Sequence, residues 1–381
     1  MGSTFLFISA QYLPTSGGVE RYTWNLSRNL IQQGHRVIVA TSALPGLPSH
    51  ELGADQIEIF RFPSWAFLQG RLPLLKPSLH FRKLAQQLWS EPIDYCVINT
   101  YFYPLSMYAV RQAHKHEIPC LIINHGSAWL MTGSLPLVLA GKLYERCAVW
   151  FCKWYCPNFY GVSHAAANWM QTFSVQARGV ITNAVSPDDI AKEIGQIDWR
   201  KKLNFSADTP IIAFVGRMIP EKGVPSLIEA MTKIRQVYPS AQLLLAGSGP
   251  LYDAYRSHPL EGVHLLGNQP YSDVLALLQQ ADLFCLPSRS EGFACTVLEA
   301  AALCCPILTT ATGDSPHLLI DESYGILLKD MAPQTIADAC IQALSDSSWR
   351  VQASKKTRQR LLENYSWNTT VSQLYRAFSI E

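Results

Sequence analysis

The sequence predicts an α/β protein built from two doubly wound domains, and three observations carry this prediction. Short runs of β-branched and aromatic residues recur along the chain and are continuously apolar, as is typical of strands buried on both faces of a parallel sheet. Segments with apolar residues at helical spacing separate them. A polar stretch without a strand candidate, residues 186–210, divides the series in two. We therefore expect two successive βαβ series.

The strand candidates follow in chain order. The first series is FLFIS (5–9), RVIVAT (36–41), IEIFRF (57–62), YCVINT (95–100), CLIIN (120–124), FYGVS (159–163) and GVITN (179–183). The second series is IIAFVG (211–216), QLLLAG (242–247), VHLLG (263–267), LFCLPS (283–288), PILTT (306–310) and YGILL (324–328). YTWNLSRNLIQQ and VPSLIEAMTKIRQV are connecting helices, and YSWNTTVSQLYRAF (365–378) is a last amphipathic helix. Two such domains are expected to face each other across a cleft lined by strand ends.

Composition limits the class of protein. With 48% hydrophobic and 16% charged residues, the 381-residue chain is expected to be globular. Residues 1–186 carry 14 basic and 8 acidic side chains, a net charge of +6, and the remainder carries 17 and 21, a net of −4. The basic half indicates either an anionic partner or ordinary solubility. Nucleic-acid binding has no further support.

The chain shows no sign of export or of membrane insertion. MGSTFLFISA lacks a basic n-region, so we expect no signal peptide, and no run of 18 uncharged apolar residues occurs. The ten cysteines contain no CxxC pair. Reduced, buried thiols in a cytoplasmic protein are favoured over a metal or disulfide site.

Two strand exits carry residues suited to phosphate. Gly17 and Gly18 lie where a loop enters a helix, and glycine there lets the backbone approach an anion, although a tight turn without a ligand has the same pattern. In AFVGRMIPEKG, Arg217 and Lys222 follow a buried strand that ends at Gly216. The forked guanidinium of the arginine and the point charge of the lysine ammonium together suit a diphosphate. The alternative is an ordinary surface loop without a ligand. Gly247 and Gly249 follow the next strand.

Two glutamates interrupt the apolar stretch SRSEGFACTVLEAAALCCPILTT. Glu291 is expected at a helix entry, and Glu299 lies eight residues further on, close to two helical turns. Both are therefore expected to face one cleft from one helix and to accept hydrogen bonds from sugar hydroxyls. The alternative is a dipole-stabilised acid at a helix start and a satisfied core glutamate.

Together these segments resemble the family 4 glycosyltransferases. The matching pieces, in the family's order, are PTSGGVERYTWNLSRNLIQQGHRV, VITNAV, FVGRMIPEKG, LLAGSGP, PSRSEGFACTVLEAAALCCPIL and ATGDSPHLLID, and they cover most of the chain. The resemblance implies the GT-B fold, with two Rossmann-like domains facing each other across a cleft. It implies an acceptor domain at 1–186, a linker at 187–209, a nucleotide-sugar donor domain at 210–362 and a C-terminal helix at 363–381 that crosses back to the first domain.

The resemblance also implies roles for single residues. Arg217 and Lys222 would hold the donor diphosphate, and Glu299 would accept from the ribose hydroxyls. Glu291 would contact the transferred sugar, helped by backbone amides at Gly292 and Phe293. Histidine at 125, in LIINHG, matches a family residue near the donor sugar, although taken alone it reads as a core histidine. The complete set is catalytic His125, Glu291, Arg217 and Lys222, and donor-binding Gly17, Gly18, Gly216, Arg217, Lys222, Gly249, Glu291, Gly292, Phe293, Ala294 and Glu299.

The reaction implied is a transfer with retained anomeric configuration, in which the departing phosphate oxygen draws the acceptor's proton. Because cations offset the charge of the leaving group, neither a metal nor a resident cofactor is expected; the donor is a co-substrate, with UDP-sugars favoured over GDP-sugars. The sequence departs from the family pattern at Ala294, Cys304, Asp314 and His317. These changes flank the sugar-binding loop and bear on the identity of the sugar.

The acceptor is the least defined part. Segments 64–85 and 129–160 mix Trp, Phe and Leu with Lys and Arg, which suits either a docking face on an anionic membrane or buried and dimer contacts. We expect a glycan or lipid-linked acceptor in cell-surface polysaccharide or glycolipid synthesis, at the cytoplasmic face of the membrane. A nucleotide-sugar epimerase and a non-catalytic sugar-nucleotide-binding subunit stay open as alternatives, whereas a nicotinamide dehydrogenase would need the GxGxxG pattern that SGGVER lacks.

Overall fold

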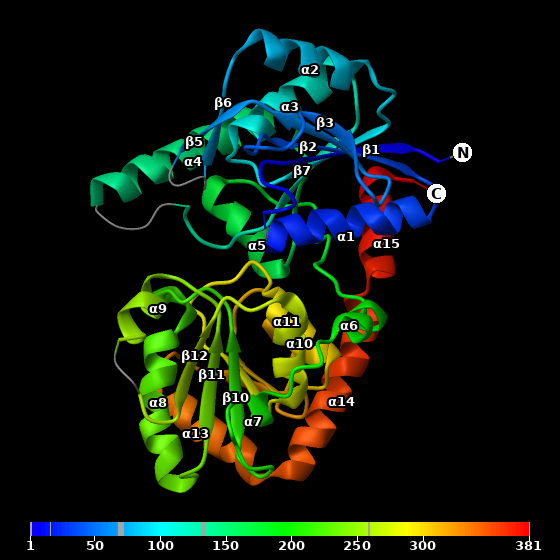
Figure 1. The fold of residues 1–381 in the computed structure, drawn as a ribbon. Helices are drawn as coiled ribbons and strands as arrows, with labels where there is room; N and C mark the ends of the chain where they lie inside the picture. The colour runs from blue at the N-terminus through cyan, green and yellow to red at the C-terminus, as the bar shows by residue number, and fades with distance from the viewer. Residues whose placement is uncertain (1, 16, 68–71, 131–134, 258–259, 381) are drawn as a thin grey trace. The chain divides into compact units, whose positions relative to one another are not determined.

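The computed structural model describes residues 2–15, 17–67, 72–130, 135–257 and 260–380. The chain divides into two compact units, Met1–Asn183 with Trp367–Glu381 and Ala184–Ser366. Each unit contains a largely parallel sheet with helices on its faces (Figure 1). The prediction of two Rossmann-like, doubly wound α/β domains is therefore confirmed.

The first unit has a seven-stranded sheet in the order β3-β4-β2-β1-β7-β8-β9, in which only β3 runs antiparallel to its neighbour. Its strands are β1 (Thr4–Ser9), β2 (Arg36–Ser42), β3 (His50–Leu52), β4 (Glu58–Phe62), β7 (Tyr95–Asn99), β8 (Cys120–Asn124) and β9 (Phe159–Gly161). A separate hairpin joins β5 (Ser64–Phe67) to β6 (Leu72–Leu75). The continuous apolar runs that predict β1, β2, β7 and β8 are buried throughout, apart from single residues at the strand starts.

Helices cover both faces of this sheet. They are α1 (Gly18–Gln32), α2 (Leu79–Ser90), α3 (Pro104–Lys115), α4 (Leu135–Tyr155), α5 (His164–Trp169), the 3-10 helix η1 (Met170–Phe173) and α15 (Trp367–Phe378). The last of these comes from the C-terminus and packs beside α1, where the Tyr375 hydroxyl lies 2.6 Å from His35 Nε2.

The second unit repeats the arrangement with a six-stranded parallel sheet in the order β12-β11-β10-β13-β14-β15. Its strands are β10 (Ile211–Val215), β11 (Gln242–Ala246), β12 (Val263–Gly267), β13 (Leu283–Leu286), β14 (Ile307–Thr310) and β15 (Ile326–Leu328). Its helices are α6 (Pro187–Glu193), α7 (Trp199–Lys202), η2 (Pro220–Lys222), α8 (Val224–Val237), α9 (Pro250–Tyr255), α10 (Tyr271–Gln280), α11 (Cys295–Ala302), α12 (Ser315–Leu318), α13 (Pro333–Ser345) and α14 (Ser347–Asn364).

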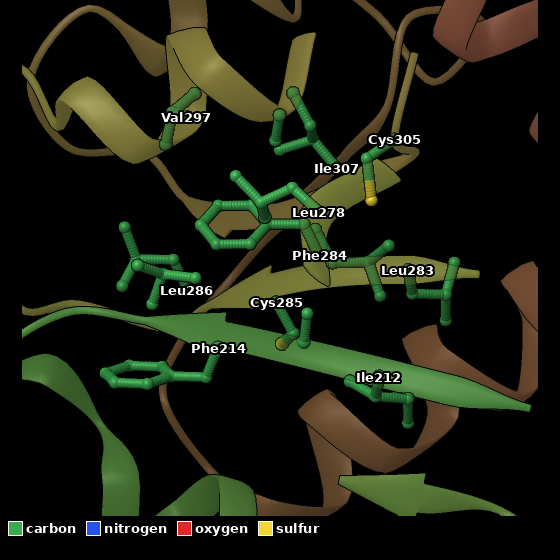
Figure 2. Close-up of a cluster of buried hydrophobic side chains, with 14 of the residues drawn as sticks. Ile212, Phe214, Leu278, Leu283, Phe284, Cys285, Leu286, Val297, Cys305 and Ile307 are labelled. Atoms are coloured by element: carbon green, nitrogen blue, oxygen red, sulfur yellow. The ribbon is translucent and has the colours of Figure 1, made fainter. Parts of the chain in front are cut away.

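The core of the second unit lies between its central strands and the helices that follow them. Figure 2 shows side chains of β10 and β13 packed with Leu278 of α10, Val297 of α11 and Ile307 of β14. Each of these side chains is at most 1% exposed. Since burial of a large aliphatic or aromatic side chain contributes about 1.5–3 kcal/mol, this cluster holds the ends of β10 and β13 in fixed register.

The segment expected to be a linker, residues 187–209, is instead part of the second unit. It forms α6 and α7, and the Trp199 side chain is 1% exposed. The indole Nε1 of Trp199 donates to the carbonyl of Asp273 at 3.0 Å, and its backbone N–H donates to Gln280 Oε1 at 2.8 Å. The prediction was wrong because it weighed the polar average of the segment, whereas one large aromatic anchors it to α10.

Two further expectations about strands need correction. The run GVITN (179–183) forms a single β-bridge, between Val180 and Gly161, and no strand. Its partner β9 is only three residues long and ends at Gly161, so the ladder has nothing to continue on. The short strands β3, β5 and β6 were not predicted, since a polar tripeptide such as HEL carries no strand pattern.

Among the described residues, no helix combines the length and the apolar character that crossing a bilayer requires.

Replacement of Trp199 by alanine is expected to lower the free energy of unfolding by about 3–5 kcal/mol, because it leaves a cavity between α7 and α10 and removes the indole hydrogen bond to the carbonyl of Asp273. Urea unfolding followed by circular dichroism measures the loss. Trp154→Ala is the matched control, since that side chain is 73% exposed, and its effect is expected to stay within about 0.5 kcal/mol. Equal losses for the two variants would contradict the structural role of α7.

Candidate active site at the strand ends of each unit

Both sheets have a position where the strand order reverses. In the second unit this lies between β10 and β13, from which the chain proceeds to opposite sides of the sheet. Loops that leave the carboxyl ends of two such strands part from each other and leave a crevice where doubly wound proteins bind ligands. The loop after β10 carries Lys222, and the loop after β13 carries Glu291.

An ion pair joins these two loops. The ammonium of Lys222 lies 2.5 Å from Glu291 Oε1 and 2.6 Å from Oε2, and the side chains are only 18% and 9% exposed. The structure brings Lys222 and Glu291 into direct contact, while the cleft expected to join them to Arg217 and Glu299 stays a prediction. Two of the three ammonium N–H groups are directed at one carboxylate, so the pair holds a cation and an anion side by side at a fixed place.

A glycine allows the loops to approach. Gly223 follows Lys222 with a φ of +74°, and a Cβ there would lie 2.2 Å from the carbonyl oxygen of Pro287 in the loop after β13. The Arg289 backbone N–H also donates to the carbonyl of Glu221 at 2.8 Å. Sequence reasoning missed Gly223, although a glycine directly before a helix that starts VPSL is a recognisable signal for a left-handed residue.

The loop after β11 packs against the same place. Gly247 and Gly249 have φ values of +134° and +148°, and added Cβ atoms would lie 1.9 Å from the Gly216 carbonyl oxygen and 2.6 Å from that of Met218. Both positions therefore need glycine. Gly216 itself does not, because a Cβ there would make ordinary contact with Phe214 at 3.5 Å.

Arg217 takes a different position from Lys222. Its side chain is exposed, and it forms no hydrogen bond or ion pair with the residues that the structure describes. Its backbone is fixed through the carbonyl, which accepts from the Ile219 N–H at 3.0 Å. The structure thus places this cation at the exit of β10 without joining it to the Lys222–Glu291 pair.

The two glutamates do not share a helix, contrary to expectation. Helix α11 begins only at Cys295, so Glu291 lies in the preceding loop, while Glu299 lies within the helix and is 5% exposed. The Tyr271 hydroxyl, at the start of α10, donates to Glu299 Oε1 at 3.1 Å. The glycine and alanine around Phe293 delay the helix, because the loop must first pass close to Gly313, where a Cβ would lie 2.9 Å from the Gly292 carbonyl oxygen.

The loop between Glu291 and α11 is held by its aromatic residue. Phe293 is 7% exposed, and its ring meets that of Tyr365 edge to face at 5.2 Å. Ala294 is the N-cap of α11, and its side chain supplies no hydrogen bond to the first turn. The backbone N–H groups at this helix start, together with those of Gly292 and Phe293, are suited to donate to a negatively polarised oxygen.

Three other residues depart from the family pattern in the second unit, namely Cys304, Asp314 and His317. Asp314 is fully buried and is the N-cap of α12, and its carboxylate lies 3.9 Å from His317 Nδ1. Cys304 has a φ of +54°, a left-handed conformation that glycine adopts more readily.

In the first unit the reversal lies between β1 and β7, and Gly17–Gly18 follow β1. Gly17 is extended, with a φ of −167°, and a Cβ there would lie 2.2 Å from Glu20 Oε2. The Glu20 side chain is thus folded back over the start of α1, and burial raises the pKa of its carboxyl group. The Glu20 carboxyl group lies at the helix start where an anion is expected, and sequence reasoning missed it although acids favour the first helical turn.

His125 follows β8 and meets the end of β7. Its Nε2 lies 2.8 Å from Asn99 Oδ1, and the Asn99 amide donates to Thr23 Oγ1 at 2.9 Å. Since the amide group of Asn99 donates to Thr23, its oxygen accepts from His125, which leaves Nδ1 as an acceptor. Part of the residue stays exposed, while desolvation of the ring lowers its pKa to about 3, so the imidazole is neutral at physiological pH.

Comparison with known proteins shows the family of the chain. The family model "Glycosyltransferase Family 4" matches residues 16–189, and "Glycosyl transferases group 1" matches residues 195–360. The glycogen synthase of Mycobacterium tuberculosis is 25% identical over 98% of this chain and 94% of its own. A GDP-mannose-dependent mannosyltransferase of Corynebacterium glutamicum, which acts on a monoacylated phosphatidylinositol monomannoside, is 31% identical over 44% of this chain and 46% of its own.

Solved structures agree on the fold. Anabaena Alr3699/HepE, determined in complex with UDP-glucose, superposes with a TM-score of 0.73 at 19% identity, over 99% of both chains. The two family models together span residues 16–360, apart from 190–194. The chain therefore belongs to glycosyltransferase family 4 and has the GT-B fold.

Proposed function

We propose that this enzyme transfers a hexose-type sugar from a nucleotide-sugar donor to a glycan or lipid-linked acceptor, with retention of the anomeric configuration, in the synthesis of a cell-surface polysaccharide or glycolipid. The observation that carries the proposal is the Lys222–Glu291 pair at the point where the strand order of the second unit reverses. A cation and an acceptor of hydroxyl hydrogen bonds at one point suit a ligand in which a phosphate and a sugar are directly joined.

Different residues of the second unit bind different parts of the donor. Lys222 binds the phosphate next to the sugar, and Glu291 accepts hydrogen bonds from the sugar hydroxyls. Arg217, which is exposed at the exit of β10, donates two hydrogen bonds to the other phosphate. Glu299, held by Tyr271, accepts from the ribose. As the bond from the anomeric carbon to the phosphate oxygen breaks, negative charge develops on that oxygen, and a preorganised ammonium stabilises it most. The same oxygen takes the proton of the attacking acceptor hydroxyl.

His125 has a positioning role in this proposal. A neutral imidazole offers hydrogen bonds without adding charge that would repel an oxocarbenium-like sugar. The Asn99–Thr23 chain fixes the orientation of the ring.

The donor and the setting are also proposed. We favour a UDP-sugar, with a GDP-sugar as the alternative. All ten cysteines are free thiols, which supports a reducing, cytoplasmic location. A lipid-linked acceptor would then place the enzyme at the cytoplasmic face of a membrane.

The first prediction concerns Lys222. With UDP-glucose, UDP-galactose, UDP-N-acetylglucosamine and GDP-mannose as probes, we expect one donor to raise the melting temperature and to be turned over. Lys222→Ala is expected to lower kcat/KM by about 10- to 150-fold, because a hydrogen bond to a charged group contributes about 1.5–3 kcal/mol. Lys192→Ala is the matched control in the same unit, since that side chain is 76% exposed.

Several outcomes would contradict the proposal. Unchanged turnover in a folded Lys222→Ala variant would remove the role of the pair, and stabilisation by a donor without any turnover would favour a non-catalytic binding subunit. Donor incubated without acceptor is expected to show slow hydrolysis; conversion to an isomeric sugar would instead identify an epimerase.

The second prediction concerns pH. Because the folded-state pKa of His125 is lowered to about 3, an unfolded chain takes up a proton at this ring below about pH 6.5 that the folded chain does not. The contribution of His125 to the free energy of unfolding is complete above pH 6.5 and is lost as the pH falls toward 3. The free energy of unfolding then changes by up to about 1.4 kcal/mol per pH unit. His125→Gln removes this slope and the exposed His80→Gln retains it, as measured by urea unfolding at pH 7, 6 and 5. NMR titration of the ring near pH 6.5 would contradict the assignment.

The third prediction concerns metal ions. Since Lys222 and Arg217 neutralise the diphosphate in this proposal, sugar transfer is expected to be unchanged by excess EDTA and by added Mg²⁺ or Mn²⁺. A loss of activity on chelation that Mn²⁺ restores would show that the cations are insufficient.

A further inference from the structure

Helix α4 exposes a continuous apolar stripe. Leu135, Leu139, Leu143, Cys147, Trp150 and Trp154 follow one another at spacings of four, four, four, three and four residues, so they lie along one side of the helix. The two tryptophans are 68% and 73% exposed, and the three leucines are 71%, 56% and 64% exposed. We call these six residues the α4 stripe.

The stripe is not the core face of the helix. The residues that pack into the first unit lie on the other side, namely Gly141, Glu145, Ala148, Val149 and Cys152, and all are buried. Helix α4 is therefore apolar on both sides, whereas a surface helix of a globular protein ordinarily has one apolar and one polar face. Large exposed apolar surfaces of this kind indicate an interaction site.

The outward charges of α4 have one sign. Arg146 and Lys153 are exposed and Lys142 is half-buried, and all three are basic. Lys142 and Arg146 lie 5.3 and 5.2 Å from the centroid of the Trp129 ring, and Lys153 Nζ donates to the carbonyl of Ser174 at 3.1 Å. The single acid of the helix, Glu145, is fully buried and accepts hydrogen bonds from the Tyr101 hydroxyl at 2.9 Å and from the Leu130 N–H at 2.7 Å. By helical angle the three cations border one edge of the stripe.

We propose that the α4 stripe docks on an anionic lipid bilayer, with α4 lying along the surface, its leucines and tryptophans among the acyl chains and the three cations at the headgroups. Tryptophan favours the interface between apolar and wet regions, and long basic side chains reach back to the headgroups. The border of a single positive sign complements anionic lipid. The inference rests on the proposed function in one respect, since the lipid-linked acceptor proposed above would lie in the bilayer on which α4 docks.

The test uses the full-length protein and vesicles of phosphatidylcholine, with and without 30% phosphatidylglycerol, by sedimentation and tryptophan emission. The wild type is expected to bind the anionic vesicles and to bind them less at higher salt. Lys142→Glu with Arg146→Glu is expected to lower the partition coefficient by about 30-fold or more. Trp150→Ser with Trp154→Ser is expected to lower it at least tenfold. Lys355→Glu and Leu362→Ser, both exposed on α14, are the controls and retain binding.

Two results would overturn the inference. One is that the wild type binds neither vesicle, or that the α4 variants bind as well as the wild type. The other is a dimer by light scattering that the α4 variants abolish without any change in vesicle binding, since the stripe would then cover a second copy of the chain.

The experiment also separates this inference from the proposed function. Donor hydrolysis without vesicles needs only the donor site, so the α4 variants are expected to keep it. Hydrolysis without vesicle binding would refute the docking face and leave the transferase in place, while vesicle binding without any turnover of a donor would do the reverse.

Discussion

The contact between the ammonium of Lys222 and the carboxylate of Glu291 is the interaction on which the site of the second unit depends. It joins the loops that leave β10 and β13, and both charges are largely removed from water. Removal of one partner from such a pair costs more than the pair contributes, because the other charge stays behind without compensation. The pair therefore fixes the two loops in the conformation that a sugar phosphate would meet.

Backbone geometry makes this contact possible. The loops after β10, β11, β13 and β14 approach one another so closely that a Cβ is excluded at Gly223, Gly247, Gly249 and Gly313. Beneath them, the buried side chains of β10 and β13 keep the strand ends in register (Figure 2). Polar function at the edge of the sheet thus rests on apolar packing in its middle, as expected where a rigid scaffold presents loops.

The first unit uses the same edge of its sheet differently. It offers a neutral imidazole held by Asn99 and a helix start covered by Glu20, and a buried Arg61 near the end of β4 pairs with Glu51. Its helix α4 meets two opposing demands, since one side completes the core while the other presents leucine and tryptophan outward. Exposed apolar surface of this extent indicates an interaction site.

The sequence by itself determined the fold class and the central strands of both sheets. Continuous apolar runs report burial on both faces, and motifs such as GRMIPEKG and EGFACTVLE lie at strand ends whatever the details of packing. Tertiary structure alone decided that Trp199 anchors 187–209 to the second unit, that Glu291 and Glu299 lie on different elements, and that Glu20 covers Gly17. It also decided which side of α4 is exposed. These features depend on contacts between residues far apart in the chain, and local periodicity carries no information about such contacts.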